Sequence, residues 1–138
     1  MTDSELFEKA LEARKQAYVP YSKFAVGAAL LTQNGEVFTG CNVENAAYPA
    51  CLCAERVAIS KAVSEGYRKF AKMAVVGGKE ELVVCFPCGE CRQVLSEFVS
   101  NSFEVIVGTE KENLKVFSMA ELLPRSFEKD VLFGGDKK

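Results

Sequence analysis

Residues 87–95 read Pro87-Cys88-Gly89-Glu90-Cys91-Arg92-Gln93-Val94-Leu95, and a second cysteine group, Cys53-Ala54-Glu55-Arg56, lies 35 residues earlier (88 − 53). Cys88 and Cys91 are three residues apart, so on a helix they share one face and can bind one ion. With Cys53, three thiolates can fill three corners of a zinc tetrahedron and leave the fourth position open for water. Glu55 places a carboxylate beside such a water. The pattern predicts a hydrolytic metalloenzyme with Zn²⁺ held by these three cysteines.

Both cysteine groups fall at predicted helix N-termini, where the helix dipole and free backbone N–H groups favour thiolates. Three thiolates leave an excess negative charge on the zinc site, and we expect Arg56 to offset it through N–H···S bonds. The alternative is a zinc or disulfide staple without catalytic meaning. Glu55 lies two residues after Cys53, and no fourth ligand is evident. Both observations favour the catalytic interpretation. Cys85 precedes Pro87 outside the chelating turn, so we do not assign it as a ligand.

The surrounding sequence predicts helices and strands in alternation. Helices are expected over residues 4–18, 53–65, 91–99 and 119–123, and strands over 25–31, 36–43, 73–76, 103–107 and 114–117. Asn34-Gly35 is a strong hairpin signal, so the first two strands are antiparallel and the sheet is mixed. We predict an α/β fold with three layers, α/β/α, around a mixed five-stranded sheet.

The composition limits the classes of function. The chain has 138 residues, 49% hydrophobic and 26% charged, with a formal net charge of −2 and no block of Lys or Arg. We expect a single domain over residues 1–138 that binds neither a nucleic acid polymer nor a membrane. The polar start and six cysteines favour the reducing cytoplasm, with Cys41 and Cys51 as small buried residues. Histidine is absent, so the metal ligands and the general base must be other groups.

The chain resembles the cytidine deaminase family, and within it the small homotetrameric form with three cysteine ligands. The resemblance rests on residues 42–46, 53–58 and 87–95, and it extends from Tyr21 to Pro124. The glutamate and Pro-Cys-x-x-Cys pattern is the signature of zinc deaminases. The resemblance implies a cytidine deaminase-like fold, one Zn²⁺ per subunit, and active sites at subunit interfaces.

The resemblance also implies the reaction. Cytidine and 2′-deoxycytidine would be hydrolysed to uridine and 2′-deoxyuridine with release of ammonia, a step of pyrimidine salvage. Zinc lowers the pKa of a bound water to roughly 7, and the resulting hydroxide attacks C4 of the base. Glu55 would take the water proton, pass it to ring N3, and then deliver a proton to the departing amine. One carboxylate acting as base and acid in turn explains why no histidine is needed.

The resemblance assigns substrate contacts within one subunit. Asn42 and Glu44, two apart on an expected strand and so on one face, would bind the ribose hydroxyls. Without the family, a polar strand end facing water is the simpler interpretation. Phe24 would pack against the pyrimidine ring, although most phenylalanines are core residues. The backbone amide of Ala54 would contact the pyrimidine.

Other contacts would come from a neighbouring subunit. Phe127 matches an aromatic that covers the base in an adjoining active site, and Ala46 and Tyr48 match a loop that contacts that substrate. Cys51 stands where the family usually has threonine, which affects the packing of this loop rather than the reaction.

Three alternatives remain at this stage. One is a deaminase of a related aminopyrimidine nucleoside such as blasticidin S, although the Asn42-Val43-Glu44-Asn45 segment favours an ordinary nucleoside. A second is an editing deaminase of polynucleotides, which the acidic chain disfavours. The third is a non-catalytic zinc module that binds a partner.

Overall fold

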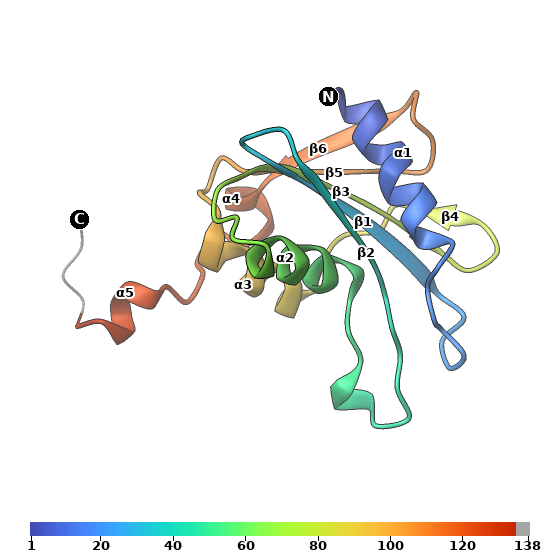
Figure 1. Ribbon diagram of the computed structural model, residues 1–138, viewed down its shortest axis with the longest axis horizontal. Coiled ribbons are helices and arrows are strands. Elements are labelled where there is room, and N and C mark those ends of the chain that lie inside the picture. The colour runs from blue at the N-terminus through green and yellow to red at the C-terminus, as the bar shows by residue number, and fades with distance from the viewer. Residues whose placement is uncertain (135–138) are drawn as a thin grey trace.

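A mixed sheet lies at the centre of the computed structural model, which describes residues 1–134 (Figure 1). The main path of the sheet runs β2-β1-β3-β5-β6, and β4 pairs with β3. The strands are β1 (Ala25–Thr32), β2 (Val37–Cys41), β3 (Phe70–Gly78), β4 (Leu82–Val83), β5 (Glu104–Gly108) and β6 (Leu114–Ser118). β3 and β5 are parallel, and the other neighbouring pairs are antiparallel. The predicted mixed sheet of five strands is confirmed, with the two-residue β4 as an addition.

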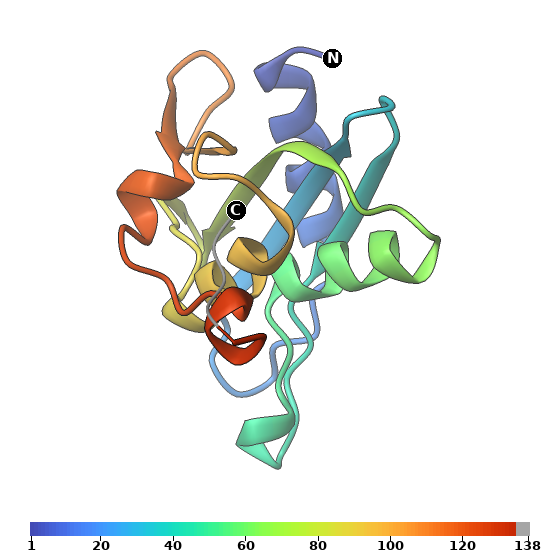
Figure 2. The ribbon, with the colours of Figure 1, turned by 90° about the vertical axis from the view of Figure 1, so that its left-hand side faces the viewer.

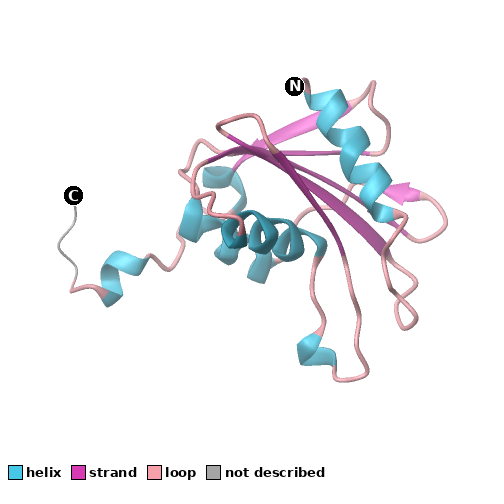
Figure 3. Ribbon diagram, viewed as in Figure 1, coloured by secondary structure: helices cyan, strands magenta, loops and turns pink. Residues whose placement is uncertain are grey.

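Helices cover both faces of this sheet, as Figure 3 shows. The helix α1 (Asp3–Arg14) packs on one face, whereas α2 (Ala54–Ser64), α3 (Gly89–Phe98) and α4 (Met119–Leu122) pack on the other. Along β1, Ala28 and Leu30 belong to one core, and Ala29 and Leu31 to the other. A strand buried on both faces reads as a continuous apolar run, which explains the sequence of β1. The three-layer α/β/α prediction is confirmed.

The hairpin between β1 and β2 also forms as predicted. Leu31 pairs with Val37 next to the turn, and Gly35 has a φ of 95°, a conformation that favours glycine. The second strand is shorter than the expected 36–43, because the chain leaves the sheet after Cys41. At Asn42 the backbone N–H still donates to the Val26 carbonyl at 3.2 Å, but the Val26 N–H donates to the Asn42 Oδ1 at 2.9 Å, because the Asn42 carbonyl accepts from the Tyr18 N–H instead.

The first helix is shorter than the expected 4–18 and ends at Arg14. The Arg14 guanidinium donates to the carbonyls of Ala25 (2.8 Å), Gly78 (2.6 Å) and Lys79 (2.8 Å), which ties the helix end to the ends of β1 and β3. Three short elements were not predicted: β4, the 3₁₀ helix η1 (Tyr48–Ala50) and α5 (Lys129–Leu132). Each has at most four residues, too few for a periodic pattern to appear.

Two loops lie together at one end of the molecule. The segment between β2 and α2, which contains η1, projects away from the sheet, and the loop between α1 and β1 lies beside it (Figure 2). The rings of Tyr21 and Tyr48 meet edge to face, with centroids 5.9 Å apart. Over residues 1–134, no helix has both the length and the apolar character needed to cross a bilayer.

Candidate metal centre and active site

Two helix N-termini bring three sulfur atoms together. Cys53 is the N-cap of α2 and Cys88 the N-cap of α3, so both precede the first helical turn, and Cys91 lies within that turn of α3. The Cys88 Sγ lies 3.8 Å from the Cys53 Sγ and 3.5 Å from the Cys91 Sγ. All three sulfurs lie within 4.8 Å of one another. The three cysteines predicted as ligands thus form one cluster.

The spacing of the sulfurs fits a zinc ion. A tetrahedron with Zn–S bonds of about 2.3 Å has edges of about 3.8 Å. The two sulfur–sulfur distances of 3.8 and 3.5 Å are close to that edge. Three sulfurs suit Zn²⁺ better than a hard cation, which prefers oxygen ligands. The cluster also leaves one corner of the tetrahedron for a non-protein ligand.

Glu55 lies in the first turn of α2, next to the sulfur cluster, and its side chain is only 4% exposed. Burial raises the pKa of the Glu55 carboxyl to about 7, and the charge of Cys53 acts in the same direction. Hydrogen bonds to backbone and to Cys91 oppose the rise. A carboxyl that titrates near neutral pH can both accept and donate a proton under physiological conditions.

The cysteines of the cluster differ in protonation. Hydrogen bonding from Cys91 lowers the pKa of Cys53 to about 6, and Cys88 and the charge of Arg56 add to this effect. The pKa of Cys91 is raised, because its proton is held in the hydrogen bond to Cys53 and because the group is buried. In this pair Cys53 is the thiolate and Cys91 the donor. Binding of a metal would replace that shared proton.

Arg56 makes a different contact from the predicted N–H···S bond. Its Nη1 donates to the Glu90 Oε1 at 3.1 Å, forming an ion pair between α2 and α3. Glu90 lies between the two cysteines of α3, so it competes with the thiolates for the guanidinium. The charge of Arg56 still favours the Cys53 thiolate, but the predicted bonding partner was wrong.

A cavity of about 170 Å³ opens at the cluster. Its lining residues come from four segments: Val26, Asn42, Cys53, Ala54, Glu55, Cys85, Phe86 and Cys88. Sequence reasoning did not assign Val26, Cys85 or Phe86 to the site. Burial raises the pKa of the Cys85 thiol to about 11, so this cysteine is a neutral wall of the cavity. Among the described residues, the sulfur cluster consists of Cys53, Cys88 and Cys91 and does not include Cys85.

Two glycines allow this cavity to form. A Cβ on Gly40 would lie 2.5 Å from the Ala54 carbonyl oxygen and 2.7 Å from the Ala58 nitrogen, so α2 packs directly on the β2 backbone. A Cβ on Gly77 would lie 2.8 Å from the Cys85 Sγ and 3.1 Å from the Phe24 Cε1. The Phe24 ring therefore lies near Cys85, although Phe24 itself is not among the lining residues of the cavity.

A family model described as "Cytidine and deoxycytidylate deaminase zinc-binding region" matches residues 1–109 of the chain. This span includes the three clustered cysteines and Glu55. The chain belongs to the cytidine deaminase family. A cytidine deaminase of Sporosarcina psychrophila is 48% identical over 132 residues, which cover 96% of each chain. The zinc-binding region and the sulfur cluster together support one Zn²⁺ in this member of the family.

Solved structures of cytidine deaminases share the fold. The enzyme from Burkholderia pseudomallei superposes with a TM-score of 0.84 at 48% identity, over 92% of this chain and 100% of that chain. The enzyme from Mycobacterium tuberculosis gives 0.78 at 38% identity, over 92% and 98%. A blasticidin-S deaminase of Bacillus cereus is more distant, at 31% identity over 134 residues, 93% of this chain and 94% of its own.

The two residues expected at the ribose occupy different places. Asn42 lines the cavity at the sulfur cluster, whereas Glu44 lines a neighbouring cavity with Tyr21, Ser22, Tyr48 and Cys51. Neither residue belongs to β2, which ends at Cys41, so the alternation of a strand does not place them on one face. The predicted strand placement was therefore wrong, although both side chains bond to the same segment, residues 21–26.

The residues expected to reach a neighbouring subunit lie away from the cavity of their own chain. Tyr48, at the tip of the loop before α2, is 68% exposed, and Ala46 in the same loop is also exposed. Phe127 is 58% exposed and lies against α3, where the Gln93 Nε2 donates to the Phe127 carbonyl at 2.8 Å. Cys51 is half-buried rather than buried, and its Sγ accepts from the Asn45 N–H at 3.3 Å. Cys41 is likewise half-buried.

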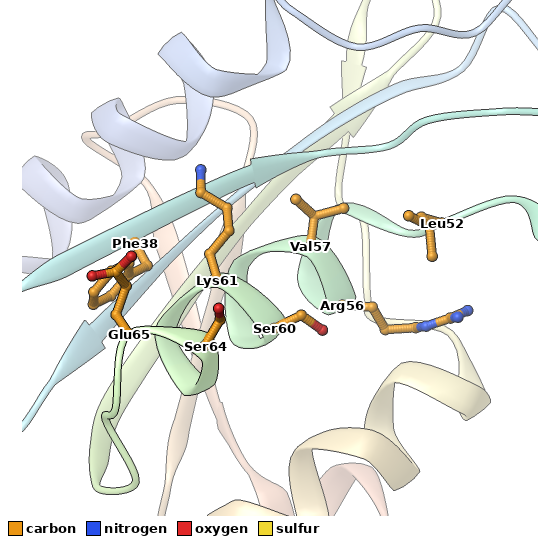
Figure 4. A pocket seen from close by; sticks show the side chains of 8 residues that line it. All are labelled: Phe38, Leu52, Arg56, Val57, Ser60, Lys61, Ser64 and Glu65. Carbon is orange, nitrogen blue, oxygen red and sulfur yellow. The ribbon is translucent and has the colours of Figure 1, made fainter.

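A larger pocket of about 430 Å³ lies on the outer side of α2. Figure 4 shows the side chains that line it: Phe38, Leu52, Arg56, Val57, Ser60, Lys61, Ser64 and Glu65. None of the three clustered sulfurs and no atom of Glu55 belongs to this lining. Its apolar members are Phe38 of β2, Leu52 before the helix, which is 41% exposed, and Val57 of α2.

Proposed function

We propose that this cytidine deaminase family member hydrolyses cytidine and 2′-deoxycytidine to the corresponding uracil nucleosides and ammonia. The observation that carries the proposal is the cluster of three sulfurs beside the buried carboxyl of Glu55, at the mouth of one cavity. Relatives named cytidine deaminase at 48% identity over 96% of the chain support the same reaction.

Glu55 moves the protons of this reaction. A bound Zn²⁺ supplies a water acidic enough to act as the nucleophile at neutral pH. The Glu55 carboxylate accepts a proton from that water and donates it to ring N3, which makes C4 electrophilic. The hydroxide then adds to C4, and Glu55 takes the remaining proton from that hydroxyl and passes it to the amine. The C4–N bond breaks, ammonia departs and C4 becomes a carbonyl. The Glu55 pKa of about 7 suits both directions of transfer.

Other residues of the chain orient the base and the sugar in this proposal. The N–H of Ala54, the first residue of α2, has no partner within the helix and faces the cavity as a donor to the pyrimidine. Phe24 packs on the ring from its position near Cys85. Asn42 and Glu44 bind ribose hydroxyls, the first from inside the cavity and the second from its neighbour. Arg56 supports the thiolates through its charge.

The enzyme works as a homotetramer with substrate sites completed across subunit interfaces in this proposal. A single chain offers about 170 Å³ at the sulfur cluster, less than the roughly 300–1,000 Å³ of ordinary ligand pockets. The exposed rings of Tyr48 and Phe127 are available to cover a neighbour's substrate, and the apolar side chains of the pocket beside α2 suit burial against another subunit. Six free cysteines support a cytoplasmic location.

A substrate panel tests the proposed reaction. Zinc-loaded and chelator-stripped protein would be incubated with cytidine, 2′-deoxycytidine and blasticidin S, with ammonia release and ultraviolet absorbance as readouts. We expect zinc-dependent deamination of both nucleosides and slower or no reaction of blasticidin S. Preferential turnover of blasticidin S would instead indicate the activity for which the more distant relative, blasticidin-S deaminase, is named. Absence of ammonia from all three substrates would refute an enzymatic function of this class.

A further inference from the structure

Ser22 occupies the centre of a hydrogen-bond network at the edge of the substrate cavity. Its hydroxyl donates to the Glu44 Oε2 and accepts from the Phe24 N–H at 3.0 Å. The serine thus connects the carboxylate of Glu44, in the loop after β2, to the backbone of Phe24, the residue just before β1. Nothing in the reaction described so far uses this hydroxyl.

The Glu44 carboxylate is largely committed to the same loop. Its Oε1 accepts from the N–H groups of Tyr21 (3.0 Å) and Ser22 (3.1 Å), while Oε2 accepts the serine hydroxyl. An ionised carboxylate has about four acceptor positions, so three are used and one is left for a ribose hydroxyl. The hydrogen bond from Ser22 is the main reason that the pKa of Glu44 is lowered from its ordinary value.

The other peptide group of Phe24 is fixed by Asn42. The Asn42 Nδ2 donates to the Phe24 carbonyl at 2.8 Å, while its Oδ1 holds the Val26 N–H. Phe24 is thus bound at its N–H through Ser22 and at its carbonyl through Asn42. Lys23, between Ser22 and Phe24 in the chain, has a φ of 62°, a left-handed conformation that is unfavourable for a non-glycine residue. A turn in this conformation needs such bonds to persist.

The geometry points to Ser22 as a positioning residue for the deamination, acting through Phe24, an inference that rests on the proposed function. The Phe24 Cε1 and the Cys85 Sγ both lie close to Gly77, so the ring stands near a lining residue of the cavity. Without the hydroxyl of Ser22, the Phe24 N–H loses its partner and the ring is free to leave the face of the pyrimidine. Packing on the base stabilises bound substrate and transition state alike, so its loss changes KM rather than kcat.

Ser22→Ala tests this inference, because the side chain is exposed and its removal leaves the core intact. We expect KM for cytidine to rise about tenfold, with kcat within about twofold of wild type. Ser22→Thr keeps a hydroxyl and should restore most of the KM. Ser102→Ala is the matched control, since it removes another exposed serine hydroxyl with a hydrogen bond, to Ser100 at 2.9 Å, and should leave both constants unchanged.

A second substrate separates action through Phe24 from action on the sugar. With 3′-deoxycytidine, which lacks the 3′ oxygen, Ser22→Ala should raise KM by the same factor as with cytidine. The inference would be overturned if Ser22→Ala left KM for cytidine unchanged, or if its increase in KM disappeared with 3′-deoxycytidine. In either case, turnover of cytidine by the wild-type protein would leave the proposed function intact. Wild-type protein that releases no ammonia from cytidine would overturn both.

Discussion

Replacement of Gly77 by alanine should disturb the cavity wall without touching the sulfur cluster. The backbone of Gly77 pairs with Val26 in the sheet, and its φ is not in the left-handed region, so the conformation accepts any residue. The obstacle is space: the new Cβ would stand 2.8 Å from the Cys85 Sγ and 3.1 Å from the Phe24 Cε1. Carbon atoms in favourable contact are about 3.5–4.0 Å apart, so both side chains must move.

The expected cost follows from these distances. Overpacking of a well-packed site typically costs about 1–3 kcal/mol, which corresponds to a fall in Tm of about 4–12 °C for a chain of this size. One of the displaced side chains, Cys85, lines the substrate cavity, so KM for cytidine should also rise, by about tenfold for each ~1.4 kcal/mol of binding energy that is lost. The bound zinc should remain, because no ligand lies within the clash.

A rescue variant sharpens the test of Gly77→Ala. The double variant Gly77→Ala/Cys85→Ala removes the sulfur that the new Cβ meets first, so part of the lost stability and affinity should return, giving a positive coupling between the two sites. Initial rates with cytidine, thermal melts of zinc-loaded protein and metal analysis measure these effects. Wild-type KM and Tm in the single variant, or strictly additive effects in the double variant, would refute the packing argument.

Two further predictions concern α2. Gly40→Ala should weaken zinc retention and lower Tm, because the new Cβ meets backbone atoms of α2 and must displace the helix that carries Cys53; wild-type resistance to a competing chelator would contradict this. In zinc-free protein, burial raises the pKa of Glu55 from 4.5 to about 7. The unfolded chain therefore loses this proton first, and stability falls as pH rises between these values. Glu55→Gln should remove about 3 kcal/mol of this pH-dependent fall in the free energy of unfolding. Urea unfolding with the same pH dependence in the variant and in wild type would contradict the prediction.

The metal centre could be predicted because its signals are local in the sequence. The spacing of Cys88 and Cys91 within one helical turn, and of Glu55 after Cys53, translates directly into positions at helix N-termini. The layered fold followed in the same way from apolar runs and one hairpin signal. The expected strand through Glu44 ends early because the Asn42 carbonyl bonds to Tyr18 and only the Asn42 side chain accepts from the Val26 N–H.

Features that depend on tertiary packing could not be read from periodicity. The partner of Arg56 is Glu90, 34 residues away, and the sequence around either residue does not predict this ion pair. The same holds for Gly77 and Cys85, whose importance comes from the side chains that converge on them. Ser22 reads as an ordinary loop serine until its contacts to two other segments are seen.

The most direct test measures zinc content and cytidine turnover together in wild-type protein and in Glu55→Gln. Glutamine keeps the size of the side chain and leaves the three sulfurs in place, but it cannot carry the protons. Both proteins should contain one zinc per chain, and the variant should lose turnover by about a thousandfold or more. Turnover by the glutamine variant close to that of wild type, or wild-type protein that deaminates cytidine equally well without zinc, would contradict the assignment of this site.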